Sequence, residues 1–269
     1  MKIRSKALTS KVLDNVLDRS YDKARKKIER FISSYVSESS AKGIVIGLSG
    51  GLDSSVALKL AVDALGSEKV LGLVMPSDTT PKEDTDQAIG LAKTLKVKYH
   101  IIYLGPIIEK YTESLPSDKR ARGNLTARIR MNILYYYAGI NSYLVLGTSD
   151  KSEILIGYFT KFGDGAADLI PTAGLYKTQV RALASHLKIP SEIIEKKSSP
   201  RLWNNHLAEE EIGMDYEIID QILYLLTDKK MGPKSAARKL GISIDQVDKI
   251  RKMMENSMHK RTLPKTAKV

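Results

Sequence analysis

The octet LSGGLDSS, residues 48–55, follows the apolar run GIVIG (43–47) and precedes the helix-like stretch VALKLAVDAL (56–65). The apolar run predicts a buried strand. Small residues at its end leave backbone N–H groups free to surround an anion at the N-terminus of the next helix, where the helix dipole favours negative charge. The octet therefore predicts a phosphate-binding loop between a strand and a helix.

This loop differs from the P-loop of kinases and GTPases. The P-loop pattern GxxxxGK[ST] places a lysine before its Ser/Thr, whereas this chain has Asp53 before Ser54. A carboxylate would repel polyphosphate unless a divalent cation lay between them. Asp53 therefore predicts a magnesium ion that binds together with a nucleotide.

Strand-like and helix-like stretches alternate beyond the loop. The predicted strands are residues 70–75, 98–104 and 142–148, and the predicted helices are residues 84–95 and 125–140. Alternation of this kind predicts an α/β fold, a doubly wound parallel sheet with helices on both faces. Because ligands of such sheets bind at the carboxyl ends of the strands, we expect LSGGLDSS and the segment GTSDKSE (147–153) to face one cleft.

The chain is expected to form a single domain over residues 1–269. Helical spacing of apolar residues predicts an N-terminal helical segment over 1–40, followed by the nucleotide-binding core over 41–197. Residues 198–269 are predicted to hold a long polar loop, which carries the sole tryptophan, Trp203, and C-terminal helices. A loop of this length is typical of a functional segment.

The chain contains no cysteine, which excludes disulfides, thiolate metal sites and cysteine nucleophiles. A built-in cysteine glutaminase is thereby excluded, so any nitrogen nucleophile would arrive as free ammonia or from a separate partner. No apolar run is long enough to span a membrane, and residues 1–11 lack the apolar centre of a signal peptide. These features predict a cytoplasmic protein without a membrane partner.

The formal net charge is +12, and residues 229–269 hold 12 Lys and Arg against 3 Asp and Glu. Such a basic tail can steer small polyanionic substrates, form a solvated surface or bind nucleic acid. Residues 235–252 resemble a helix-turn-helix with a glycine turn, which leaves a nucleic-acid-binding or tRNA-modifying protein as an alternative. Steering of small anions is favoured, because the nucleotide that the phosphate-binding loop predicts is itself a small polyanion.

A second segment, residues 147–177, is dense in charge and glycine and contains TKFGDG at 160–165. Together with LSGGLDSS, it makes the chain resemble the ammonia-dependent NAD synthetases of the ATP pyrophosphatase superfamily. The resemblance implies an adenine nucleotide alpha hydrolase-like fold, a Rossmann-like three-layer sandwich. It also implies a ligase that amidates deamido-NAD with ammonia and ATP through an acyl-adenylate, giving NAD, AMP and pyrophosphate, and that acts as a homodimer.

The same resemblance implies roles for individual residues. Magnesium would be held by Asp53 and Glu153. ATP would be bound by Gly47, Leu48, Ser49, Gly50, Gly51, Leu52, Asp53, Ser54, Thr148, Lys177 and Ser199. Deamido-NAD would be bound by Arg128, Lys161, Asp168, His259 and Lys260.

Two residues are assigned to catalysis. Lys177 would neutralise charge on the departing pyrophosphate. Asp164, in the TKFGDG loop, would attract ammonium and accept its proton. The nearest alternative keeps the superfamily and changes the acceptor, as in the ATP pyrophosphatase subunit of GMP synthetase, although the TKFGDG segment speaks against it.

Overall fold

The computed structural model describes residues 11–203 and 205–267. In this part of the chain, four strands form one parallel sheet in the order β3-β2-β1-β4. Their bounds are β1 (Gly43–Gly47), β2 (Val70–Val74), β3 (Lys98–Ile101) and β4 (Tyr143–Leu146). The chain winds outward from β1 through β2 to β3 and then returns to place β4 on the other side of β1. The crevice between β1 and β4 is therefore the topological switch point, where ligands of such sheets bind.

Alternate residues of the strands enter two different hydrophobic cores. On β1, Ile44 and Ile46 face one core, and Val45 faces the other. All three side chains are fully buried. The near-continuous apolar character of GIVIG follows from this burial on both faces, which is typical of parallel sheets.

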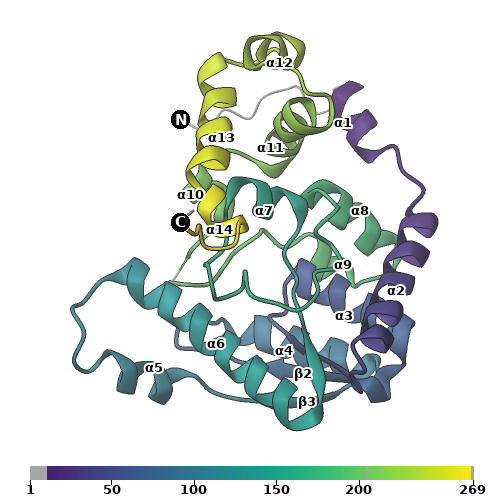
Figure 1. The fold of residues 1–269 in the computed structure, drawn as a ribbon, viewed down its shortest axis with the longest axis vertical. Coiled ribbons are helices and arrows are strands. Elements are labelled where there is room, and N and C mark those ends of the chain that lie inside the picture. Colours follow the sequence, from purple (N-terminus) through teal and green to yellow (C-terminus); the bar gives the residue numbers. More distant parts are fainter. Residues whose placement is uncertain (1–10, 204, 268–269) are drawn as a thin grey trace.

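Helices cover both faces of the sheet (Figure 1). The first face is covered by α2 (Tyr21–Glu38), α3 (Leu52–Leu65), α4 (Lys82–Thr94), α8 (Lys177–His186) and α9 (Ser191–Ile194). The second is covered by α5 (Gly105–Thr112) and α6 (Lys119–Asn141). A short 3-10 helix, η1 (Ser67–Lys69), leads into β2. The predicted doubly wound α/β fold is confirmed.

A third hydrophobic core lies at the carboxyl end of the sheet. It is built mainly from α1 (Lys11–Leu17), α7 (Lys151–Ile156), α10 (Ala208–Ile212), α11 (Tyr216–Leu223), η2 (Tyr224–Asp228), α12 (Pro233–Leu240) and α13 (Ile244–Asn256). The short α14 (Met258–Arg261) follows α13. Figure 1 shows α11, α12 and α13 grouped on the far side of α7 and α8 from the sheet. Helices α7 and α8 thus connect this C-terminal group with the nucleotide-binding core.

The predicted elements differ from the observed ones mainly at their ends. The helix expected at 125–140 begins earlier, at Lys119, because Asp118 accepts a hydrogen bond from the Ala121 N–H and caps it. The strand expected at 98–104 ends at Ile101. Helix α8 was not predicted at all, and the first ten residues of the predicted N-terminal helical segment lie outside the described residues. Within the described residues, no helix is long and apolar enough to cross a membrane.

Candidate active site

A cavity of about 540 Å³ opens at the carboxyl ends of β1, β2 and β4. Its walls include the phosphate-binding loop, the first residues after β4, the middle of α6 and the loop that contains TKFGDG. Of the residues predicted to function, those that line it are Gly47, Leu48, Ser49, Gly51, Leu52, Asp53, Ser54, Thr148, Glu153, Asp164, Ser199 and Lys260. The cleft expected from the two strand ends is therefore present.

The phosphate-binding loop is held in shape by its own serines. The Ser54 hydroxyl lies 3.0 Å from the Ser49 hydroxyl and donates to the Gly51 carbonyl, and the Gly51 N–H donates to Ser49 Oγ. Gly51 is the N-cap of α3 and has no side chain, so the first-turn amides of that helix are left for a ligand. The loop thus keeps the geometry of an anion site.

Gly50 allows the loop to pass close to α4. Its φ is +71°, a conformation that favours glycine, and a Cβ there would lie 2.0 Å from the Asp84 carbonyl oxygen. Any larger residue would push the phosphate-binding loop away from α4. The first glycine of the motif is therefore required by the close approach of two segments.

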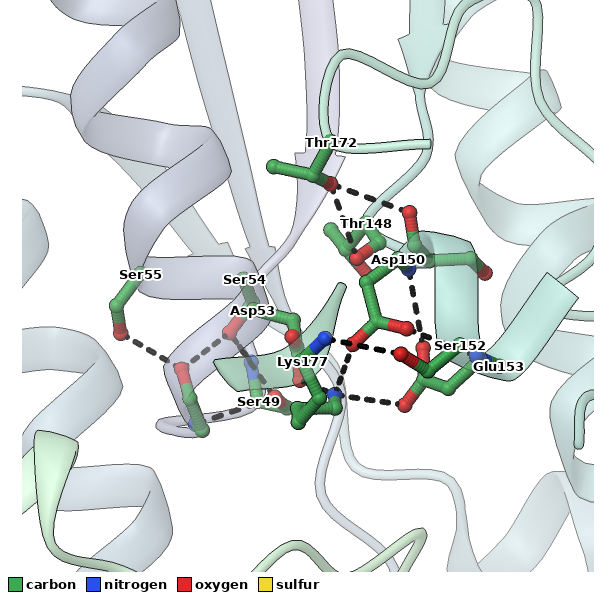
Figure 2. A network of polar contacts seen from close by, with 12 residues as sticks. Ser49, Asp53, Ser54, Ser55, Thr148, Asp150, Ser152, Glu153, Thr172 and Lys177 are labelled. Atoms are coloured by element: carbon green, nitrogen blue, oxygen red, sulfur yellow. Dashed lines mark hydrogen bonds and ion pairs between the residues drawn. The ribbon is translucent and has the colours of Figure 1, made fainter. Parts of the chain in front are cut away.

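Lys177, at the start of α8, lies among three carboxylates (Figure 2). Its Nζ is 2.8 Å from Asp53 Oδ2, 2.9 Å from Asp150 Oδ2 and 2.9 Å from Glu153 Oε1. The lysine side chain is fully buried, as is that of Asp150. The structure therefore brings together three predicted site residues, Asp53, Glu153 and Lys177, and adds a fourth.

Burial governs the electrostatics of this cluster. It would lower the pKa of Lys177, but the charges of Asp150, Asp53 and Glu153 raise that pKa well above its usual value. The pKa values of Asp150 and Glu153 are raised, first by burial and then by repulsion among the carboxylates, against the opposing effect of Lys177. Three carboxylates surround one ammonium, so the cluster favours a further cation.

Asp150 was missed as a site residue, although its segment was singled out. Its Oδ1 accepts the Glu153 N–H at 2.8 Å, and Glu153 Oε2 accepts the Asp150 N–H at 3.2 Å. This is a capping box, which the D-x-x-E spacing of GTSDKSE signals in the sequence. The pattern predicts the helix start of α7 but not that the capping carboxylate also reaches a lysine from α8.

One unpaired carboxylate oxygen of this cluster could bind a magnesium ion. Asp53 Oδ1 is buried and has no hydrogen-bond partner, so it is free to ligate a cation. Among the described residues, no group of three or more acidic or histidine side chains forms a complete metal cage. Magnesium that arrives with ATP needs only one or two protein carboxylates, because the phosphates supply other ligands.

Asp164 lies on the cavity wall, where Oδ1 accepts the Thr160 N–H at 2.9 Å. Desolvation raises the pKa of its carboxyl, against the opposing effects of that hydrogen bond and of the Lys260 charge. Lys260 also lines the cavity and donates to the carbonyls of Gly157 and Phe159, at 2.7 and 2.8 Å. Desolvation lowers the pKa of Lys260. The two predicted residues thus share one part of the cavity wall.

Four residues expected to bind the dinucleotide lie away from the cavity lining. Three are linked to one another, since Arg128 Nε donates to the Lys161 carbonyl and Lys161 Nζ donates to the His259 carbonyl. The fourth, Asp168, supports the sheet by accepting the Val145 N–H at 2.7 Å. Their binding roles stay predictions.

Loop residues 196–203 close one side of the cavity. Lys196 Nζ and Arg201 Nε contact the buried Asp84 carboxylate at 2.7 and 2.8 Å, and Lys196 also donates to the Gly50 carbonyl at 3.2 Å. Ser199, predicted to contact ATP, uses its hydroxyl within the loop to bond the His206 carbonyl. The loop is thus tied to both α4 and the phosphate-binding loop.

An aromatic wall completes the cavity and was not predicted. Trp203 stacks on His206 with ring centroids 3.5 Å apart, and His206 Nε2 lies 2.7 Å from Glu211 Oε2. Tyr158 also donates to Glu211, at 2.7 Å. All four line the cavity. The only sequence signal was the tryptophan in a long polar loop.

Arg130 is a further cavity residue that sequence reasoning missed. It extends from α6 and donates through Nε to the Met75 carbonyl at 3.3 Å, just beyond the end of β2. Burial lowers its pKa. Arg128, two residues earlier and 200° away around the helix, points elsewhere. No motif in the helix distinguishes the two arginines.

Comparison with known proteins agrees with this geometry. Residues 24–264 match the model of the family described as NAD synthase. The chain is 53% identical over 227 residues to an NH3-dependent NAD+ synthetase from Hyperthermus butylicus, and the match covers 83% of this chain and 82% of that protein. The relatives thus support NAD synthesis over the GMP and nucleic-acid alternatives.

Two solved structures are similar over nearly the whole chain. NMN synthetase from Francisella tularensis has a TM-score of 0.84 and 34% identity, with 94% of this chain and 100% of that chain covered. NH3-dependent NAD synthetase from Campylobacter jejuni has a TM-score of 0.80 and 30% identity, with 93% and 100% covered. With a matching fold, phosphate-binding loop and family model, the chain belongs to the NAD synthase family.

Proposed function

We propose that the chain is a ligase that amidates deamido-NAD with ammonia at the expense of ATP. The observation that carries this proposal is the meeting of the phosphate-binding loop with Lys177, Asp53 and Glu153 at the switch point of the sheet. A relative at 53% identity that is an NH3-dependent NAD+ synthetase supports it. The chain contains no cysteine, so its nitrogen nucleophile would be free ammonia or ammonia delivered by a separate partner.

The reaction proceeds in two steps that need no protein nucleophile. The nicotinate carboxylate oxygen of deamido-NAD attacks the α-phosphorus of ATP, the bond to the β-phosphate breaks, and pyrophosphate leaves. Ammonia then attacks the acyl carbon, the carbon–oxygen bond to AMP breaks, and the amide forms. The protein positions two polyanions and neutralises charge on the leaving group, a role suited to the first-turn amides of α3 and to Lys177.

Magnesium is proposed to bind with ATP at Asp53 and Glu153. When bound, it would neutralise charge on the phosphates. Support comes from Asp53 Oδ1, which is buried and without a partner, and from the excess of carboxylates around Lys177. The other predicted ATP contacts, Thr148 and Ser199, line the same cavity.

Replacement of Asp53 tests the metal site. Asp53→Ala should abolish magnesium-dependent pyrophosphate release, because it removes a ligand and one partner of Lys177, while the far-ultraviolet circular dichroism stays that of a folded protein. The measurement is pyrophosphate release against magnesium concentration. Asp63→Ala, in a surface ion pair with Lys59 at the far end of the same helix, is the control. A wild-type magnesium response in Asp53→Ala refutes the assignment.

Asp164 is proposed to accept the proton of ammonium. Desolvation raises its pKa, which makes the carboxylate a better proton acceptor, and its place on the cavity wall makes it accessible. Asp164→Asn should leave pyrophosphate release nearly intact and lower amide formation by about 100-fold or more, the usual contribution of a general base. Both products are measured in the same reaction, and equal loss of both would exclude the role.

The finer features of the family remain proposals for this chain. Deamido-NAD would contact Lys260 in the cavity and the linked residues Arg128, Lys161 and His259 beside it, with Asp168 supporting the sheet. A homodimer in the cytoplasm is proposed on the same resemblance. Exposed Tyr136 and Ile140 on α6, with side chains more than half accessible, provide an apolar surface for a second copy.

A second substrate, nicotinic acid mononucleotide, follows from the likeness to NMN synthetase. Purified protein is incubated with ATP, magnesium and ammonium and either dinucleotide or mononucleotide acid, with XMP and glutamine arms as controls. We expect NAD, AMP and pyrophosphate in equal amounts from deamido-NAD. Faster turnover of the mononucleotide would reassign the substrate, and no AMP from either would overturn the proposal.

A further inference from the structure

Asp220 is a fully buried carboxylate on α11 that no motif in the sequence marks. It lies outside the cavity lining, behind the start of α8. Its Oδ1 accepts the Ser152 hydroxyl at 2.5 Å, and its Oδ2 accepts the Thr178 N–H at 2.8 Å. One side chain from α11 therefore joins α7 to α8.

The hydrogen bonds around Asp220 continue through Ser152 to the backbone of Lys177. Ser152 Oγ donates its proton to Asp220 and accepts the Lys177 N–H at 3.0 Å. The first two amides of α8, those of Lys177 and Thr178, are thus satisfied from α7 and α11. A carboxylate at a helix N-terminus is also favoured by the helix dipole.

The same two helix starts carry the charged cluster of the candidate active site. Ser152 lies directly before Glu153 and two residues after Asp150, and Thr178 directly follows Lys177. The position of the Lys177 ammonium relative to the carboxylates of Asp150 and Glu153 thus depends on how α7 meets α8. Asp220 hydrogen-bonds to both helix starts at that contact.

Chemistry explains why the residue is aspartate. Both carboxylate oxygens accept hydrogen bonds here, whereas an amide would present a donor to one of these two groups. An amide nitrogen facing Ser152 would leave the Ser152 hydroxyl without its acceptor, and one facing the Thr178 N–H would bring two donors together. A buried carboxylate beside Asp150 is costly, since burial raises the pKa of Asp220 to about 7. An asparagine would avoid that desolvation cost but would lose one of the two acceptor oxygens.

We propose that Asp220 is a positioning residue for the amidation reaction, which holds the starts of α7 and α8 so that Lys177 reaches Asp53, Asp150 and Glu153. It acts through Ser152 and the amide of Thr178 and does not touch substrate. This inference rests on the proposed function for its kinetic consequence. Its structural part, the placement of Lys177, is independent of the substrate.

The kinetic test uses Asp220→Asn, Ser152→Ala and the double variant. Asp220→Asn should lower kcat by about 10- to 100-fold, as loss of a supporting hydrogen bond does, with KM values for both nucleotides changed by less than about threefold. The double variant should lose no more than the more impaired single variant, because both changes break one chain. Glu217→Gln is the matched control, since Glu217 also ties α11 to α8, through Arg181 on the surface, 3.1 Å away.

A second measurement does not depend on activity. Lys177 is fully buried in the wild type, so an amine-acetylating reagent followed by peptide mass spectrometry should leave it unmodified in the folded protein. In Asp220→Asn, Lys177 should be acetylated measurably faster, whereas in Glu217→Gln it should stay protected. Thermal unfolding confirms that each variant is folded at the assay temperature.

The outcomes separate the two claims. Wild-type kcat in Asp220→Asn, or a loss fully explained by the unfolded fraction, overturns the inference while the proposed function stands. Unchanged acetylation of Lys177 overturns it as well. If the wild type makes no NAD but Asp220→Asn exposes Lys177, the proposed function fails and the positioning of Lys177 by Asp220 is retained.

Discussion

At the scale of single residues, the candidate site depends on one buried lysine. A buried ammonium is stable only when paired, and Lys177 has three carboxylate partners within 2.9 Å. Three carboxylates share this one ammonium, and the pKa values of Asp150 and Glu153 are raised, so the cluster favours a further cation. Perturbed pKa values thus cluster where ATP and magnesium are proposed to bind, which is typical of functional sites.

Asp220 makes fold stability depend on pH. Its pKa is raised from 3.8 to about 7 in the folded protein, so between these values the folded chain binds more protons than the unfolded chain. The free energy of unfolding should therefore fall by on the order of 4 kcal/mol as pH rises through this window, if Asp220 acted alone. Below pH 4 the contribution of Asp220 to the free energy of unfolding is fully present.

Urea denaturation at pH 4, 5, 6, 7 and 8 checks this prediction. The difference in unfolding free energy between the wild type and Asp220→Asn should shift in favour of the variant as pH rises. Asp228→Asn, at a partly exposed ion pair with Lys151, is the control. Its free energy of unfolding should change with pH in the same way as that of the wild type. Parallel profiles for Asp220→Asn would contradict the raised pKa.

At the scale of elements, three segments meet at Asp84. The Asp84 carboxylate on α4 accepts hydrogen bonds from Lys196 and Arg201 of the loop at 196–203. Lys196 also donates to the carbonyl of Gly50 in the phosphate-binding loop. The Asp84 side chain is 6% exposed, so these charge-assisted bonds are shielded from water. The pairing holds the loop against the ATP side of the cavity.

Asp84→Asn should therefore weaken ATP binding without removing a catalytic group. Loss of hydrogen bonds to a charged partner costs roughly 1.5–3 kcal/mol, which corresponds to about a 10- to 100-fold higher KM for ATP. The KM for deamido-NAD and the fold should change little. Asp86→Asn, in a surface pair with Lys82 on the same helix, is the control in steady-state kinetics. An unchanged KM for ATP would show that the loop is held by other contacts.

At the scale of the whole molecule, two bodies of helices enclose the site. One packs on the sheet and the other, with its own hydrophobic core, lies beyond the carboxyl ends of the strands. The cavity takes its lining from residues of both, from the phosphate-binding loop to Ala208 and Lys260. Binding of a nucleotide there should therefore stabilise the whole chain.

The proposed dimer is tested through α6. Tyr136 and Ile140 are 68% and 63% exposed on this helix. Two such side chains on one helix form a larger exposed apolar surface than a single residue would. Sedimentation velocity should give a dimer for the wild type, and Ile140→Asp should shift it toward monomer. Leu263→Asp, at a still more exposed apolar residue near the C-terminus, should stay dimeric. A wild-type monomer at micromolar concentration would refute the proposed dimer. A dimeric Ile140→Asp variant would show that the dimer interface does not lie at this part of α6.

Local sequence patterns were enough to predict the sheet and the phosphate-binding loop. Alternating apolar runs and the octet at 48–55 suffice for both, because strand burial and a helix N-terminus are local properties of a short stretch. The same holds for GTSDKSE, whose pattern encodes a helix start. The binding roles of residues such as Arg128 and Lys161 come from the family resemblance and do not follow from such local patterns.

Which side chains meet in the site depends on the packing of distant segments and could not be read from such patterns. Asp150 and Asp220 lie 70 residues apart in sequence, and neither carries a motif that points to Lys177. Arg130 lines the cavity and Arg128 does not, because the rotation of α6 on the sheet selects between them. Contacts of this kind depend on packing between distant elements, and a buried charge is tolerated only where that packing supplies its partners.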